Sequence, residues 1–117
     1  MRVLIVDDNE QSRWMIRHYL RDRRCEFQEC ADGADVIPAY EKFLPDWVLM
    51  DWEMERVNGL TATSRLLACF PEARILIVTG YDGSALRQAA LEVGARGFVL
   101  KDDLLALRSI LDADKTV

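Results

Sequence analysis

Polar side chains with clear chemical uses directly follow four short apolar runs of the chain. The runs and their polar residues are 3–6 with Asp7 and Asp8, 47–50 with Asp51, 75–78 with Thr79, and 98–100 with Lys101. Continuous apolar runs are typical of buried parallel strands, and open α/β sheets bind ligands at the carboxyl ends of such strands. Three carboxylates, a hydroxyl and an ammonium would therefore line one crevice, which suits a metal ion and a phosphoryl group.

The three aspartates, Asp7, Asp8 and Asp51, would create an electrostatic conflict if their strands are neighbours. Carboxylates placed close together raise one another's pKa and destabilise the fold. A hard divalent cation such as Mg²⁺ resolves this conflict, because it binds carboxylate oxygens and keeps positions for phosphate oxygens and water. Any one aspartate alone is explained better as a solvated strand end or a helix cap, but four polar strand ends together are not.

The elements that would hold these side chains alternate between strand and helix five times. Strands are expected at residues 3–6, 25–30, 47–50, 75–78 and 98–100. Helices are expected from residue 9 or 12 to about 24, from 34 to about 43, from 59 toward 70, from 84 to 93, and from about 104 onward. This alternation predicts a parallel sheet with helices on both of its faces.

Two of the helices carry clear signals of their ends and of their buried sides. Asn9 or Ser12 could cap the first helix, since both residue types accept a hydrogen bond from a free backbone N–H. Helical spacing predicts an inward face there that consists of Met15, Ile16, Tyr19 and Leu20. In the last helix, the same spacing predicts that Leu104, Leu107 and Leu111 face inward.

Composition favours a single globular domain, residues 1–117, that does not bind nucleic acid itself. Half of the residues are hydrophobic and the formal net charge is −5, whereas duplex binding needs clustered Lys and Arg. The one basic cluster, Arg21, Arg23 and Arg24, is explained by a solvated helix end.

The cysteines and the apolar runs favour a cytoplasmic protein with no membrane partner. Cys25, Cys30 and Cys69 are odd in number and lack metal-binding spacing, which predicts thiols in a reducing compartment. The longest apolar runs are far shorter than the roughly 20 residues that a membrane span needs. Met1-Arg2 leads directly into the first strand, so no signal peptide is expected.

With these residues in order, the chain resembles the receiver domains of two-component response regulators. The matching segments are residues 4–9, 45–51, 58–59, 77–79 and 94–101, and the resemblance extends from about Arg2 to Leu111. It implies a three-layer, doubly wound (βα)5 flavodoxin-like fold with strand order 2-1-3-4-5. It also implies a signalling switch that catalyses only its own phosphorylation and dephosphorylation, and not an enzyme with external substrates.

The resemblance implies a role for each polar strand end. Asp51 would accept a phosphoryl group from a histidine kinase or a phosphotransfer protein. Asp8 and Asp51 would bind Mg²⁺, or Mn²⁺ in its place, together with the backbone carbonyl of Glu53, and Asp7 would orient metal-bound water.

The remaining strand ends would bind the phosphoryl group itself. Lys101 and the Thr79 hydroxyl would each contact a phosphoryl oxygen, and backbone N–H groups near Trp52 and Gly80 would complete the cradle.

A phosphorylated Asp51 would then switch a surface of the domain. In the resembling family, Thr79 moves toward the phosphoryl group, and an aromatic residue of the fifth strand, Phe98 here, turns into the vacated space. A plain core phenylalanine explains Phe98 equally well. The output surface would consist of the fourth helix, the fifth strand and the fifth helix, and a homodimer could form through it.

Several residues depart from the pattern of the family. Asp102 follows Lys101 where proline is common, which predicts a trans peptide. Glu55 also stands in place of a proline, and Gly80 in place of a small residue that is commonly alanine. Glu53 and Tyr81 would flank the pocket and tune hydrolysis of the phosphoaspartate.

The Lys101-Asp102 pair is typical of the subfamily in which receivers precede helix-turn-helix DNA-binding domains. No such domain is present, so the chain is either a single-domain regulator or an excised receiver.

Two alternative functions and one alternative surface role stay open. The chain could be a pseudo-receiver, a docking module that phosphate does not switch, or a Mg²⁺-dependent phosphatase that forms an aspartyl-phosphate. Such phosphatases usually carry an Asp-x-Asp nucleophile on the first strand, whereas this chain has Asp7-Asp8-Asn9. Trp14, on the polar side of the first helix, is either a partner anchor or a ring that lies over arginine stems.

Overall fold

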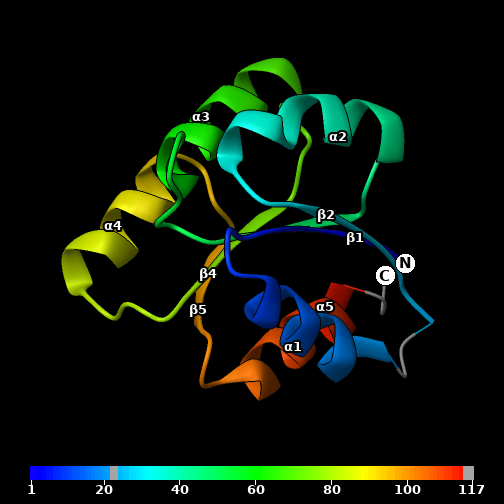
Figure 1. Ribbon diagram of the computed structural model, residues 1–117. Helices are drawn as coiled ribbons and strands as arrows, with labels where there is room; N and C mark the ends of the chain where they lie inside the picture. Colours follow the sequence, from blue (N-terminus) through cyan, green and yellow to red (C-terminus); the bar gives the residue numbers. More distant parts are fainter. Residues whose placement is uncertain (22–23, 115–117) are drawn as a thin grey trace.

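The computed structural model describes residues 1–21 and 24–114, and Figure 1 shows one twisted sheet between helices. The strands are β1 (Arg2–Val6), β2 (Glu26–Cys30), β3 (Trp47–Met50), β4 (Ile75–Thr79) and β5 (Gly97–Leu100). Neighbouring strands are parallel, and their order across the sheet is β2-β1-β3-β4-β5. The predicted doubly wound topology is therefore confirmed.

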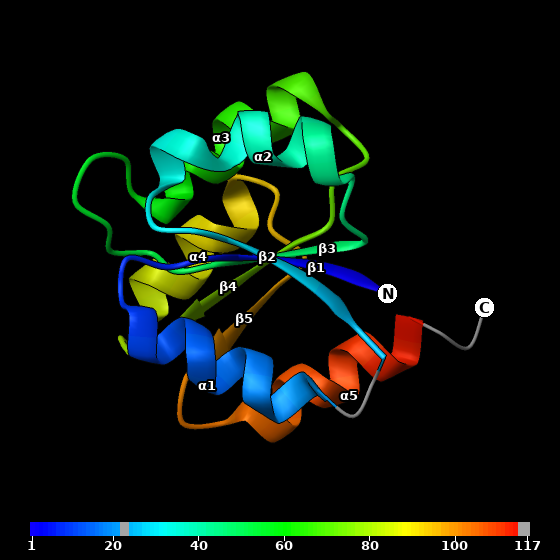
Figure 2. The ribbon, with the colours of Figure 1, turned by 45° about the vertical axis from the view of Figure 1, so that its right-hand side comes forward.

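The helices form the two outer layers of the molecule. They are α1 (Glu10–Leu20), α2 (Val36–Phe43), α3 (Gly59–Cys69), α4 (Ser84–Glu92) and α5 (Leu104–Asp114), with a short 3-10 helix, η2 (Gly33–Asp35), before α2. Figures 1 and 2 show α2, α3 and α4 on one face of the sheet and α1 and α5 on the other. None of the helices within residues 1–21 and 24–114 is long and apolar enough to cross a membrane.

Two hydrophobic clusters, one on each face of the sheet, explain why the central strands are apolar throughout. Leu4 and Val6 of β1 pack in the cluster under α2, α3 and α4, whereas Val3 and Ile5 pack in the cluster under α1 and α5. Because both faces of a central strand are covered, its sequence shows no alternation of polar and apolar residues. The edge strand β2 is more exposed, which accounts for its mixed composition.

Helix α1 is shorter than expected and buries a narrower stripe. It ends at Leu20 instead of near Arg24, and Arg23 lies outside the described residues. Ile16 and Leu20 are buried as predicted, but the prediction for Met15 was wrong, because its side chain is 38% exposed. Each residue turns a helix by about 100°, so Met15 lies beside the buried stripe and not within it.

The start of α1 settles which residue caps it. The Oδ1 atom of Asn9 accepts the backbone N–H of Ser12 at 2.9 Å, so Asn9 is the N-cap. The Ser12 hydroxyl is therefore not needed for capping. In α5, the predicted inward residues Leu104, Leu107 and Leu111 are all buried.

Candidate functional site

The carboxyl ends of β1, β3, β4 and β5 bring the predicted polar residues together. The register pairs Val6 with Met50 and Thr79 with Leu100. The ladder continues one residue further, because the Asp51 N–H donates to the Val6 carbonyl at 2.9 Å and the Lys101 N–H donates to the Thr79 carbonyl at 2.9 Å. The polar residues thus begin where the buried strands end, as the sequence predicts.

Three carboxylates meet at this edge of the sheet. Asp7, Asp8 and Asp51 each place an oxygen within 4.8 Å of the others. Asp7 and Asp51 are 1% and 6% exposed, whereas Asp8 is open to solvent. The Oδ1 atoms of Asp7 and Asp51 accept the backbone N–H groups of Asn9 and Trp52, both at 2.9 Å. These N–H bonds fix one oxygen of each buried carboxylate.

The Lys101 ammonium lies among the remaining oxygens. Its Nζ is 2.7 Å from Asp7 Oδ2 and 3.3 Å from Asp51 Oδ2. It also donates to the Ser12 hydroxyl at 3.2 Å. The sequence predicts a lysine that contacts a phosphoryl group, but it gives no sign that the lysine also pairs with the acidic residues or contacts Ser12.

The pKa values reflect this concentration of charge. Burial raises the pKa of Asp51, the Asp7 charge raises it further, and Lys101 and the Thr79 hydroxyl partly oppose the rise. Burial alone would lower the pKa of Lys101, but the carboxylates of Asp7 and Asp51 outweigh it and raise this pKa overall. One ammonium therefore shares a site with three acidic groups, and an added cation would relieve the repulsion that remains.

A cavity of about 330 Å³ opens beside the carboxylates. Its lining residues are Asp8, Asn9, Asp51, Glu53, Met54, Glu55 and Lys101. Glu53 and Glu55 are exposed, so their side chains add negative charge at the rim and not in the buried interior. The space and its oxygen-rich lining fit a hydrated divalent cation, since Mg²⁺ keeps several waters when it binds carboxylates.

Removal of the ammonium should destabilise the domain in the absence of divalent cations. We expect Lys101→Met to lose about 2 kcal/mol of unfolding free energy at pH 8 in EDTA, between the values for exposed and buried pairs. Mg²⁺ should restore more stability to the variant than to the parent chain, because it no longer competes with the ammonium for carboxylate oxygens. Urea unfolding with and without Mg²⁺ measures both effects.

The control for this experiment is Lys42→Met, which removes an exposed lysine from the last turn of α2. Equal losses in the two variants, or equal gains with Mg²⁺, would contradict the assigned role of Lys101 in charge neutralisation.

Asp32 holds the loop that follows β3, although the sequence indicates only a turn at Asp32-Gly33. Its Oδ1 accepts the N–H groups of Ala34 and Val57 at 2.9 and 3.0 Å, and its Oδ2 accepts that of Arg56 at 2.8 Å. Burial raises the pKa of this carboxyl, but the three N–H donors outweigh burial and the net pKa is below the ordinary value. Asp32 therefore connects η2, directly before α2, to the segment that carries Glu53.

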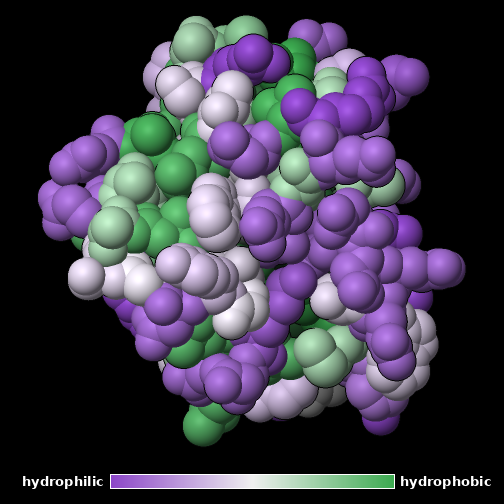
Figure 3. Space-filling model, turned by 60° about the vertical axis from the view of Figure 1, so that its left-hand side comes forward, coloured by the Kyte–Doolittle hydropathy of each residue, from purple (hydrophilic) through white to green (hydrophobic). Residues whose placement is uncertain are grey.

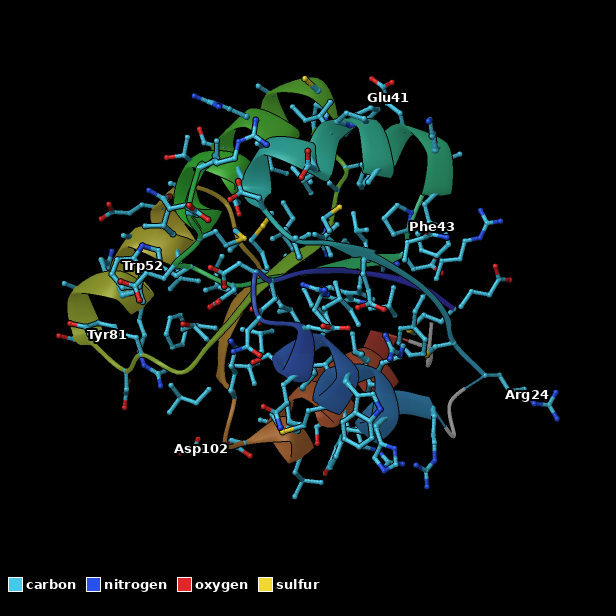
Figure 4. All side chains as sticks on the ribbon, viewed as in Figure 1. Arg24, Glu41, Phe43, Trp52, Tyr81 and Asp102 are labelled. Carbon is cyan, nitrogen blue, oxygen red and sulfur yellow. The ribbon has the colours of Figure 1, made fainter. Side chains whose placement is uncertain are left out.

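Two aromatic rings cover the side of the site next to α4. The rings of Trp52 and Tyr81 lie 5.2 Å apart between centroids, with 46° between their planes. Figure 4 shows both residues, and Asp102, on one side of the molecule, away from Arg24 and Phe43. The Tyr81 N–H donates to the Thr79 hydroxyl at 3.4 Å. Figure 3 shows that this end of the molecule mixes hydrophobic and hydrophilic residues.

A family comparison agrees with this geometry. The sequence model of the response regulator receiver domain matches residues 3–112. The chain belongs to the receiver domain family of response regulators. Among solved structures, this receiver domain is similar to that of NarL from Mycobacterium tuberculosis, with 27% identity, a TM-score of 0.85, and coverage of 99% of this chain and 97% of that one.

Further relatives include longer proteins. A LuxR-family response regulator structure from Aurantimonas sp. SI85-9A1 is 33% identical and has a TM-score of 0.81. The match covers 96% of this chain and 85% of that one. The transcriptional regulatory protein DegU of Brevibacillus brevis is 31% identical over 120 residues, and NreC of Staphylococcus aureus is 35% identical over 129 residues. The receiver domain matches over its full length but spans only 50% of DegU and 58% of NreC.

Three further predictions for this receiver domain concern Phe98, Trp14 and the peptide bond before Asp102. Phe98 is half-buried on β5, and the Arg87 guanidinium of α4 lies 4.5 Å from the centroid of its ring. The exposed Trp14 stacks on the His18 ring, with 4.7 Å between the ring centroids. The described peptides include no cis bond, so the trans prediction at Asp102 is confirmed.

Proposed function

We propose that this receiver domain accepts a phosphoryl group on Asp51 from a histidine kinase or a phosphotransfer protein. The observation that carries the proposal is the position of the Asp51 carboxylate. One oxygen is held by the Trp52 N–H, and the other lies 3.3 Å from the Lys101 ammonium beside an oxygen-lined cavity. A nucleophile, a cationic group and space for a phosphoryl group therefore occur together.

The transfer requires no general base from the protein. A carboxylate oxygen of Asp51 forms the new P–O bond while the P–N bond to the donor imidazole breaks, and the imidazole nitrogen keeps that electron pair. Carboxylates are ordinarily ionised at pH 7. Burial and the Asp7 charge raise the pKa of Asp51, whereas Lys101 and the Thr79 hydroxyl partly oppose this rise and so favour the ionised form. The only histidine, His18, is exposed on α1 and stacks on Trp14, so it is not needed for the transfer.

Four groups of the chain would hold the metal ion. The carboxylates of Asp8 and Asp51 and the backbone carbonyl of Glu53 would bind it directly, and the carboxylate of Asp7 would orient metal-bound water. The donor set fits Mg²⁺ or Mn²⁺, and the buried Asp7 Oδ2, apart from its ion pair with Lys101, receives no hydrogen bond from the described residues. When bound, the ion supplies positive charge that offsets the charge of the transferring phosphoryl oxygens.

Lys101, Thr79 and two backbone groups would bind the phosphoryl oxygens directly. Phosphoryl transfer depends mainly on positioning and charge stabilisation. The Trp52 N–H already points at the Asp51 carboxylate, and Gly80 has no heavy atom within 4 Å of the position of a Cβ. The Gly80 N–H is proposed to complete the phosphoryl cradle, and Glu53, which lines the cavity, and Tyr81 would tune hydrolysis.

The phosphoryl group would then act on α4, β5 and α5. Thr79 and Phe98 are the proposed switch residues, and the Arg87 contact ties the Phe98 ring to α4. A move of the ring would disturb this contact and so change the proposed output surface. A homodimer through this surface, an anchoring role for Trp14 and single-domain organisation over residues 1–117 stay predictions.

The relatives suggest the wider setting of the domain. DegU is named as a transcriptional regulatory protein, and this chain spans half of its length. We propose that the domain controls a helix-turn-helix output domain of a longer protein and that it acts in the cytoplasm.

Phosphorylation by a small donor tests the proposal. The parent chain should take up one phosphate from labelled acetyl phosphate with Mg²⁺, the phosphate should be labile to base, and EDTA should prevent uptake. Asp51→Asn should lose uptake by at least 100-fold, because an amide is a poor nucleophile. Asp102→Asn is the matched control, since it removes an exposed aspartate at the same end of the molecule.

Two results would contradict the proposal. Equal labelling of Asp51→Asn would show that another residue accepts phosphate. No labelling of the parent chain, together with no Mg²⁺-dependent change in Trp52 fluorescence, would favour the docking module that phosphate does not switch.

A further inference from the structure

Ser12 contacts the candidate site from a helix that supplies none of the predicted site residues. Its hydroxyl accepts a hydrogen bond from Lys101 Nζ at 3.2 Å, across 89 residues of sequence. The backbone N–H of Ser12 is already bound by the Asn9 cap. The Ser12 side chain therefore has no capping duty at the start of α1, and its observed contact is with Lys101.

The hydroxyl completes the surroundings of the Lys101 ammonium. An ammonium has three N–H donors and no acceptor. Asp7 Oδ2, Asp51 Oδ2 and Ser12 Oγ lie 2.7, 3.3 and 3.2 Å from Nζ. Two carboxylates, which directly follow β1 and β3, and one hydroxyl from α1 thus surround the ammonium, and they hold the end of this long, flexible side chain in one place.

We propose that Ser12 is a positioning residue that holds the Lys101 ammonium between Asp7 and Asp51. A serine suits this role because its hydroxyl accepts a hydrogen bond without adding charge. An acidic residue at this position would add a fourth carboxylate to a site in which burial and the Asp7 charge already raise the pKa of Asp51. An alanine would leave the third N–H of the ammonium without its protein acceptor.

The consequence for phosphoryl transfer rests on the proposed function. A positioned ammonium meets an incoming phosphoryl oxygen without first losing side-chain freedom. We expect Ser12→Ala to slow phosphorylation of Asp51 by about three- to tenfold, the factor that corresponds to one ordinary hydrogen bond. Ser12→Thr, which keeps a hydroxyl, should react at close to the parent rate.

A cycle of variants tests whether Ser12 acts through Lys101. The rate of labelling by acetyl phosphate is measured at fixed Mg²⁺ for the parent, Ser12→Ala, Lys101→Met and the double variant. Ser12→Ala should slow the parent chain but have no further effect in Lys101→Met. Ser64→Ala, which changes an exposed serine within α3, controls for the general effect of alanine in a helix.

A second measurement does not depend on phosphorylation. Proton exchange with water should be slow for the Lys101 ammonium in the parent, so that its ¹⁵N–¹H signal is visible by NMR, with assignment from its absence in Lys101→Met. The signal should broaden in Ser12→Ala and persist in Ser12→Thr and Ser64→Ala. If the parent chain takes up no phosphate, the proposed function fails, and this signal alone decides the role of Ser12.

Either of two results would overturn the role of Ser12. One is an unchanged Lys101 signal in Ser12→Ala together with a parent-like labelling rate. The other is an equal loss of rate from Ser12→Ala in the parent and in Lys101→Met, which would mean that Ser12 supports the fold and not the ammonium.

Discussion

Replacement of Gly59 by alanine should destabilise the domain by about 3 kcal/mol, at the upper end of the range for overpacking. A Cβ at this position would lie 2.0 Å from the Asp51 carbonyl oxygen, 2.9 Å from the Asp51 carbonyl carbon and 3.0 Å from the Trp52 Cα. All three are backbone atoms and cannot rotate away. Helix propensity alone would favour alanine over glycine by about 1 kcal/mol, so the steric conflict determines the expected sign.

Gly80→Ala is the matched control for Gly59→Ala. Gly80 directly follows Thr79, and a Cβ there would meet no heavy atom within 4 Å. Its stability should stay within about 0.5 kcal/mol of the parent, as is usual for substitutions that meet no neighbour. Urea unfolding followed by circular dichroism measures the free energy of unfolding of both variants. This signal does not depend on the fluorescence of Trp52, which lies next to the substituted Gly59. Equal stabilities for the two would mean that α3 does not begin against the backbone of Asp51.

Gly59 also shows where sequence reasoning reaches its limit. Asn58-Gly59 predicts the start of a helix, and Asn58 does cap α3 by accepting the Thr61 N–H at 2.9 Å. The close approach to Asp51 is different, because it depends on how the intervening loop returns to the strand. In that loop, the Gly59 N–H donates to the Trp52 carbonyl at 2.7 Å. Local sequence patterns predict the cap of a helix, but they do not predict that a loop brings the helix start back against the backbone of a strand end.

The fold and the cluster of strand ends were predictable for a common physical reason. Strands covered on both faces must be apolar, so each run ends abruptly where the chain leaves the sheet. In β4, all residues from Ile75 to Thr79 are buried, and the change from Val78 to Thr79 marks the edge. Once the strands are parallel, their carboxyl ends meet at one edge, which brings Asp7, Asp51 and Lys101 together.

The contact between Lys101 and Ser12, and the choice of the residue that α1 buries, were not predictable in the same way. Lys101 could reach several acceptors, and only the packing of α1 puts the Ser12 hydroxyl within 3.2 Å of its Nζ. Met15 fits the apolar spacing of α1 equally well as Ile16, and the position of the sheet decides which one is buried. Such choices depend on the three-dimensional arrangement, which periodicity alone does not contain.

Replacement of Asp32 by alanine should cost about 3 kcal/mol of unfolding free energy at pH 7. Hydrogen bonds to charged groups contribute about 1.5–3 kcal/mol each, and the carboxylate accepts three of them, from Ala34, Arg56 and Val57. We expect less than the simple sum, because the loop can partly rehydrate its N–H groups. Asp32→Asn should lose less, since its amide oxygen still accepts at one side while its NH₂ faces a donor.

The pH dependence separates the charge of Asp32 from its shape. The folded-state pKa of this carboxyl is below its ordinary value of 3.8. Its contribution to stability is therefore complete above about pH 4 and decreases as the pH falls through the folded-state pKa. The stability difference between the parent and Asp32→Asn should be constant from pH 7 to 5 and should shrink below pH 4. Urea unfolding at each pH gives this difference.

Asp35→Asn is the control for the charge change, because Asp35 is exposed three residues away. A difference in stability between the parent and Asp32→Asn that stayed constant from pH 7 to pH 3 would mean that the Asp32 charge does not stabilise the fold.

The hydrogen bonds of Asp32 should also affect the metal site, because the N–H groups of Arg56 and Val57 that they hold follow Glu53 in the loop. Since a loosened loop would present the Glu53 carbonyl less often, Asp32→Ala should also bind Mg²⁺ more weakly than Asp35→Asn, as measured by Trp52 fluorescence.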